Sequence, residues 1–74
     1  MRLFLLTYDR RRRRLLSRLE FEPGEYERAN QAMLQAELDH PDLEVVLLEA
    51  ASIDDLKRTH RRYFEDLTGF LQPA

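Results

Sequence analysis

The run Leu3-Phe4-Leu5-Leu6-Thr7-Tyr8 decides the fold, because it is the most apolar stretch of the chain. Its length and its aromatic residues are typical of a β-strand. Both of its faces are apolar, without the polar alternation of a half-exposed strand. This run is therefore predicted to be the central strand of a sheet.

A second strand is predicted directly after the charged residues 9–14. Residues 15–22 alternate in polarity, which is the pattern of a half-exposed strand. One face of this strand would carry Leu15, Ser17, Leu19 and Phe21, and the other Leu16, Arg18, Glu20 and Glu22. Residues 9–14 are expected to join the two strands as a hairpin.

Two helices and a third strand are predicted in the rest of the chain. Pro23-Gly24 ends the second strand, and a helix begins near Glu25 and ends before Pro41, which disfavours helical geometry at His40. Its inner face would be formed by Tyr26, Ala29, Ala32, Met33 and Ala36, with Leu34 and Leu38 as a second, offset stripe. Residues 43–50, rich in Val and Leu, predict the third strand. Ser52 then caps a second helix, whose apolar stripe comprises Ile53, Leu56, His60, Tyr63, Phe64, Leu67 and Leu71.

These elements predict a single α+β domain over residues 1–74, in the order β-β-α-β-α. We expect two layers: a three-stranded, largely antiparallel sheet of order 2-1-3, with both helices on one face. Placing the third strand beside the first keeps the most apolar strand in the middle. One alternative places the third strand beside the second and parallel to it, and another places the helices on opposite faces of the sheet.

Both helices on one face would leave the other face of the sheet exposed. A contiguous apolar patch on a small protein usually marks an interface. A chain of 74 residues has a marginal core, and without cysteine it lacks both disulfides and thiolate metal sites. The sequence therefore predicts a homodimer formed through Phe4, Leu6, Tyr8, Leu16, Val46 and Leu48.

Charge is distributed unevenly along the chain. Twelve basic and fourteen acidic residues give a net charge of −2, and five of the basic residues form the run Arg10-Arg11-Arg12-Arg13-Arg14. Without this run, seven basic residues face fourteen acidic ones, a net charge of −7. No apolar stretch reaches the roughly 20 residues that span a membrane. The cysteine-free composition is compatible with a reducing compartment, and a cytoplasmic location is expected.

The arginine run has two interpretations. Five like charges on one turn repel each other, and a polyanion such as nucleic acid would relieve this repulsion. Alternatively, the run is a solvated hairpin tip that keeps the sheet edge soluble. No aromatic residue interrupts the run, which argues against stacking on single-stranded bases.

The second helix carries further basic residues, of which Arg58, Arg61 and Arg62 are candidates for the same anion contact. They would assist the arginine run if the two lay side by side. Acidic residues four positions away offer a simpler interpretation, a solvated face of ion pairs. The pairs would be Asp54–Arg58, Arg61–Glu65 and Arg62–Asp66.

Catalytic and metal-binding patterns are not recognisable in the sequence. His60, beside Tyr63 on the predicted stripe, is either a packed core histidine or a general base. No nucleophile elbow, phosphate loop or metal-ligand spacing is present, so no metal and no cofactor is predicted. The leading hypothesis is a small, non-enzymatic accessory or regulatory protein, a homodimer that binds another macromolecule. The alternatives are a nucleic-acid-binding protein that uses residues 10–14, and a small enzyme or ligand binder around His60 and Tyr63.

Overall fold

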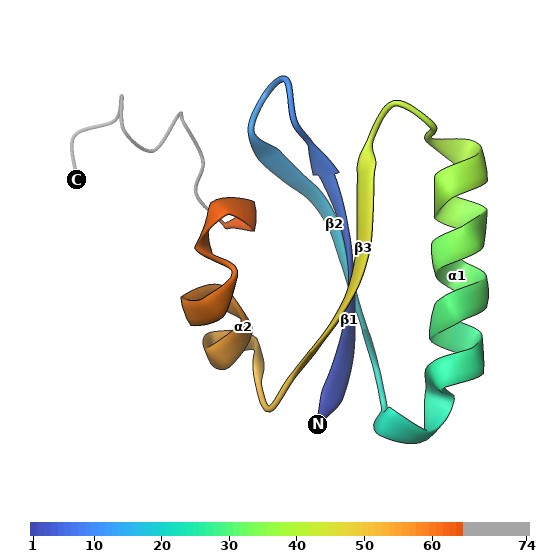
Figure 1. The fold of residues 1–74 in the computed structure, drawn as a ribbon, viewed down its shortest axis with the longest axis vertical. Helices are drawn as coiled ribbons and strands as arrows, with labels where there is room; N and C mark the ends of the chain where they lie inside the picture. The colour runs from blue at the N-terminus through green and yellow to red at the C-terminus, as the bar shows by residue number, and fades with distance from the viewer. Residues whose placement is uncertain (65–74) are drawn as a thin grey trace.

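The structure, a computed structural model, describes residues 1–64 and contains one three-stranded sheet. The strands are β1 (Arg2–Asp9), β2 (Arg14–Phe21) and β3 (Glu44–Ala50). Their order is β2-β1-β3, and both outer strands run antiparallel to β1 (Figure 1). The predicted order of elements and the central position of the first strand are confirmed. All six residues of the run 3–8 are buried, which explains why this strand lies in the middle.

Two α-helices and two short 3₁₀ turns complete the described fold. The turn η1 (Pro23–Glu25) leads into α1 (Tyr26–Asp39), and β3 is followed by α2 (Ile53–Thr59) and η2 (Arg61–Tyr63). A capping box between Glu22 and Glu25 fixes the entry to η1. Ser52 caps α2 as predicted, because its side chain accepts a hydrogen bond from the backbone N–H of Asp55.

The second helix is shorter than its apolar stripe predicts. It ends at Thr59, since His60 has non-helical backbone angles (φ −125°, ψ 54°) and its N–H closes the last turn on the carbonyl of Leu56. Thr59 also bonds back to carbonyls of the preceding turn, a competing interaction typical of Ser and Thr. Leu67 and Leu71 of the predicted stripe lie outside the described residues.

The two helices lie on opposite faces of the sheet, so the prediction that they share one face is wrong. Figure 1 shows the sheet between α1 and α2. The strands β2 and β3 run parallel to each other, and α1 is the crossover between them, so the handedness of this connection determines the face that α1 covers. The other face of β1 is equally apolar, and α2 covers it.

Burial of that second face removes the predicted dimer interface. Phe4, Leu6 and Tyr8 are buried in a cluster with Leu56 and Tyr63, which come from the α2 side. Val46 and Leu48 pack against the same cluster, while Leu16 is 50% exposed. The predicted interface is therefore mostly the interior of a single chain.

A β-bulge explains the exposure of Leu16. The register between β1 and β2 shifts between Thr7 and Tyr8, so that Tyr8 pairs with Leu15 instead of Leu16. The predicted alternation holds in β2 after the bulge, where Ser17 and Leu19 face the α1 side. Before the bulge, Leu15 turns toward the core on the α2 side, a common effect of an extra residue in one strand.

Candidate anion-binding site

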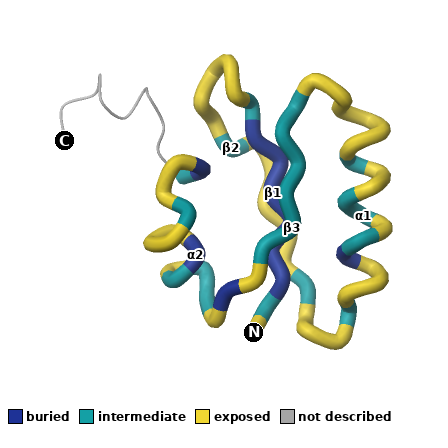
Figure 2. The backbone as a smooth tube through the Cα atoms, viewed as in Figure 1, coloured by how far each residue is buried: buried dark blue, intermediate teal, exposed yellow. Residues whose placement is uncertain are grey.

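Four of the five consecutive arginines form the turn between β1 and β2, and Arg14 begins β2; residues 10–14 are here called the arginine turn. Asp9 shapes this turn: its Oδ1 accepts hydrogen bonds from the backbone N–H groups of Arg11 (3.0 Å) and Arg12 (3.2 Å). Such an Asp side chain stabilises a turn by replacing backbone partners. Arg13 takes the left-handed conformation (φ 53°) that closes the turn. All five arginines are exposed at one end of the sheet (Figure 2).

Most of the positive charge on the arginine turn is not neutralised within the described chain. Arg12 Nε lies 3.8 Å from Asp9 Oδ2, and Arg10 Nε lies 3.7 Å from Glu44 Oε1. Both arginine side chains are at least three-quarters exposed, so these long contacts contribute little. Among residues 1–64, no carboxylate pairs with Arg11, Arg13 or Arg14.

Glu44 connects the arginine turn to the segment after α2. Its Oε2 accepts hydrogen bonds from the Tyr63 hydroxyl and from Arg62 Nη2, the latter at 2.5 Å. Its other oxygen, Oε1, is buried and accepts no hydrogen bond from residues 1–64, and Arg10 Nε lies 3.7 Å from it. The first residue of β3 is thus hydrogen-bonded to Arg62 and lies near Arg10, which come from distant parts of the chain.

Two tyrosines form the apolar side of this cluster. The rings of Tyr8 and Tyr63 meet edge to face, with centroids 5.2 Å apart. The Arg62 guanidinium lies over both rings, 4.3 Å from the centroid of Tyr63 and 5.7 Å from that of Tyr8. Cation–π contact and the ion pair with Glu44 together orient Arg62.

The contacts in this cluster shift the pKa values of Glu44 and Tyr63 in opposite directions. Burial disfavours the carboxylate of Glu44, but the hydrogen bonds from Tyr63 and Arg62 and the charges of Arg62 and Arg10 outweigh it, so the pKa of Glu44 is lowered. Burial and the hydrogen bond to Glu44 raise the pKa of Tyr63, and Arg62 only partly offsets them. The acid is therefore held charged and the phenol neutral around pH 7.

The three basic residues predicted to assist the turn have different surroundings. Arg62 shares Glu44 with Arg10, whereas Arg58 forms an ion pair with Asp55 inside α2 instead of the predicted Asp54. Arg61 is exposed on η2. The predicted partners Glu65 and Asp66 lie outside the described residues.

His60 is a half-buried residue at the junction of α2 and η2, not part of a continuous helix stripe. Its ring is tilted by 44° to that of Tyr63, and the two centroids are 6.3 Å apart. The Tyr63 hydroxyl donates to Glu44, so the acid–base partner of Tyr63 is a glutamate. The hypothesis of a site around His60 and Tyr63 therefore receives no support from this geometry.

Glu44 is the site residue that the sequence analysis missed. Strand alternation alone does not reveal it, because its partners are 18 and 19 residues away. One signal was available: Glu44 is the acidic first residue of a strand in which five of seven residues are apolar, in a chain rich in arginine. Buried acids of this kind are usually paired.

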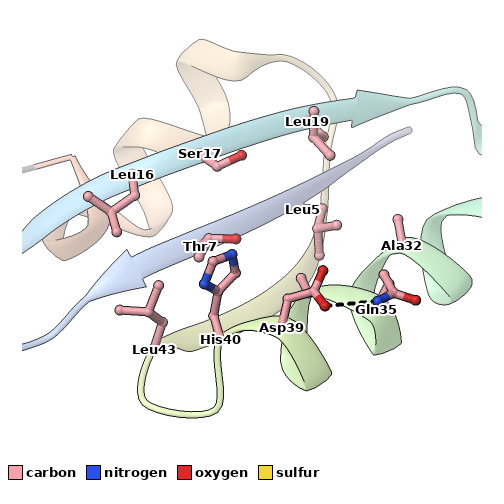
Figure 3. Close-up of a pocket in the computed structure, with 11 residues that line it drawn as sticks. Leu5, Thr7, Leu16, Ser17, Leu19, Ala32, Gln35, Asp39, His40 and Leu43 are labelled. Atoms are coloured by element: carbon pink, nitrogen blue, oxygen red, sulfur yellow. Dashed lines mark hydrogen bonds between the residues drawn. The ribbon is translucent and has the colours of Figure 1, made fainter.

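A groove lies between α1 and β2, on the side of the sheet opposite to α2 (Figure 3). It has a volume of about 470 Å³. Leu5, Leu16, Leu19, Ala32, Ala36 and Leu43 give it an apolar lining. Polar groups gather toward its end near His40, where Gln35 donates a hydrogen bond to Asp39.

Comparisons with known protein families, with curated proteins and with solved structures found no match to this chain. No helix within residues 1–64 is long and apolar enough to cross a membrane. In the same part of the chain, no three His, Asp or Glu side chains are grouped closely enough to hold a metal ion.

Proposed function

We propose that this protein is a small, non-enzymatic accessory protein that binds nucleic acid through its arginine turn. The observation that carries the proposal is the charge of Arg11, Arg13 and Arg14, which no carboxylate of residues 1–64 neutralises, on a turn fixed by Asp9. A fixed turn presents several guanidinium groups together, so the backbone loses little conformational entropy when the side chains bind a row of phosphates. A cytoplasmic location is part of this proposal.

Phosphate is the anion that best suits the turn. The planar guanidinium forms paired hydrogen bonds with phosphate oxygens, and phosphates in nucleic acid recur at short, regular spacing. No aromatic side chain lies within the turn to stack on bases. We therefore expect contacts to the backbone of a duplex, with little sequence preference.

The rest of the molecule supports binding in one orientation. Outside the arginine turn the chain has a net charge of −7, so the remaining charge on balance repels phosphate. An uneven charge distribution steers a charged partner during encounter. The turn is therefore the point of contact, and the sheet and helices serve to hold it.

The test is a binding titration with a fluorescent, mixed-sequence DNA or RNA duplex at about 50 mM salt. The double variant R11S/R14S should lower the affinity at least tenfold, because two phosphate contacts are lost. The matched control R28S/R58S changes the net charge equally, and both of its arginines are engaged with acids three residues away. Control binding should stay within about twofold of the wild type.

Two results would contradict the proposal. Absence of wild-type binding to either duplex at low salt removes nucleic acid as the partner. An equal loss of affinity in R11S/R14S and R28S/R58S would show that only net charge matters. A polyglutamate peptide serves as the comparison ligand, and tighter binding to it than to the duplexes would point to an acidic protein instead.

A further inference from the structure

Two apolar surfaces on the α1 side of the molecule have no partner within the described chain. The first is the groove between α1 and β2, in which Leu16 and Leu19 are about half exposed. The second, here called the outer stripe, consists of Leu34 and Leu38, which are 54% and 77% exposed. At 100° per residue the outer stripe points away from the sheet, opposite the alanine face of α1. A helix that is apolar on two opposite sides is typical of one covered on both.

The groove exists because α1 is too narrow to cover the whole sheet. A helix with its side chains is about 10 Å wide, whereas three strands at about 4.8 Å spacing span more than this. In this fold α1 packs on β3 and β1. The α1 side of β2 therefore stays uncovered over a strip about one strand wide, and a second helix beside α1 would lie on this strip and extend past the edge of the sheet.

We propose that this space is filled by α1 of a second copy of the chain, in a twofold-symmetric dimer. Each α1 would lie between two sheets, with its alanine face on its own sheet and its outer stripe on β2 of the partner. The twofold axis runs parallel to α1 and between the two helices. A twofold axis normal to the sheet would leave both sheets on the same side of the two helices, so that neither outer stripe would be covered.

The second copy fits because the two surfaces occupy the same level along the molecule. A rotation about an axis parallel to α1 keeps the height of each residue, so Leu34 faces Leu19 of the other copy, and Leu38 faces Leu16. Ala32 and Ala36 of α1 line the same groove as Leu16 and Leu19 of β2. Leu34 and Leu38 belong to the same turns of α1 as these alanines, so they lie at the same height along the molecule as Leu16 and Leu19. The contact between the outer stripe of one copy and β2 of the other occurs twice in the dimer. It covers both apolar surfaces of each copy and leaves no site for a third copy.

The composition and size of the contact suit a self-association of moderate strength. The uncharged Gln31 and Gln35 flank the outer stripe on one side and Glu37 flanks it on the other, and charge is depleted at the centre of protein interfaces but not at their rim. A 14-residue helix is about 21 Å long. Two such helices side by side give a flat footprint of roughly 400 Å² per copy, about half that of a standard stable interface and in the range of weak, reversible association. We expect a dissociation constant in the micromolar range.

Sedimentation equilibrium of the full chain between about 2 and 500 µM tests the proposal. The wild type should pass from monomer to dimer, and the single variants L34K and L19E should each remain monomeric. An equimolar mixture of L34K and L19E should dimerise again, because one Lys–Glu pair and one native Leu–Leu pair form in the mixed dimer. The control T59K adds the same charge as L34K on the other face of the sheet and should dimerise as the wild type does.

Several outcomes would overturn the dimer. These are a wild type that stays monomeric at 500 µM, larger polymers, or a dimer that one of the two single variants leaves intact. Failure of the mixture to dimerise would also overturn it, because it would show that Leu34 and Leu19 do not meet. Circular dichroism and urea unfolding of each variant establish that it is folded, and L38K, at the more exposed position of the outer stripe, repeats the test if L34K is not.

Discussion

Glu44 joins three parts of the molecule that are distant in the sequence: the arginine turn, the first residue of β3 and the η2 turn. Its side chain is only 18% exposed, so the carboxylate would be costly to bury without its partners. Arg62 and the Tyr63 hydroxyl supply hydrogen bonds to one of its oxygens. Glu44 is therefore the residue that fixes η2 on the sheet and sets Arg62 beside Arg10.

The pH dependence of stability should follow from this cluster. The folded-state pKa of Glu44 is lowered, so its contribution is present above the unfolded value of about 4.3 and is lost as the pH falls through the folded value. The pKa of Tyr63 is raised, so its contribution is present below about 10 and is lost as the pH rises through the folded value. Urea unfolding at a series of pH values should show a plateau between these limits and a decrease on either side.

The substitution E44Q should lower the free energy of unfolding by about 1–2 kcal/mol at pH 7, because a hydrogen-bonded charge is replaced. It should also reduce the loss of stability at acidic pH, since one titrating group is gone. The control is E49Q, which removes the same charge from an exposed position of β3 and should change stability by less than about 0.5 kcal/mol. Equal effects of both substitutions would contradict the role of Glu44.

At the scale of elements, α2 is a helix of only seven residues, so its stability depends on its cap and its packing. Ser52 accepts the hydrogen bond at its start, Asp54 and Asp55 lie in the first turn, and Leu56 is fully buried against β1. Acidic residues at the start of a helix interact favourably with its dipole. The Ser52 cap therefore helps to keep α2 folded over Phe4 and Leu6.

Substitution S52A should lower the free energy of unfolding by about 1 kcal/mol, measured by urea unfolding at pH 7. The control S17A removes the hydroxyl of an exposed serine in β2 and should change it by less than about 0.5 kcal/mol. If the midpoint of urea unfolding of S52A equals that of the wild type, the side-chain cap contributes nothing to stability and α2 is held by packing alone.

Elements were easier to predict than their arrangement in space. The strand bounds and the α1 helix follow local patterns, such as the apolar run 3–8 and the stop at Pro41, and the structure confirms them to within one or two residues. The end of α2 did not follow its pattern, because the stripe continues through His60 while the backbone turns there. The bulge beside Leu15 was equally hidden, since it depends on pairing between two strands.

At the scale of the whole molecule, charge is separated between one end and the rest. The arginine turn projects at the end of the sheet where β1 meets β2, while the remainder of the chain is acidic (Figure 1). In the proposed dimer the twofold axis is parallel to α1, so both arginine turns would lie at the same end of the assembly. The pair would then contact a longer stretch of phosphates than a single turn.

The salt dependence of duplex binding should report the number of phosphates contacted. The slope of log affinity against log salt is about −0.9 per phosphate neutralised, so three to five contacts give roughly −3 to −5. The variant R11S/R14S should make this slope about two units shallower, and R28S/R58S should leave it unchanged. The measurement is a duplex titration at four salt concentrations. A slope near zero for the wild type would rule out phosphate contact.

The sequence by itself determined the strands, the α1 helix, the central position of β1 and the arginine turn, because periodicity, caps and charge runs act over a few residues. Only the tertiary structure decided that α1 and α2 take opposite faces and that the predicted interface residues Phe4, Leu6 and Tyr8 are interior. It also decided that Glu44 meets Arg10 and Arg62. These features depend on chain crossings and contacts between distant residues, whose energies no local pattern records.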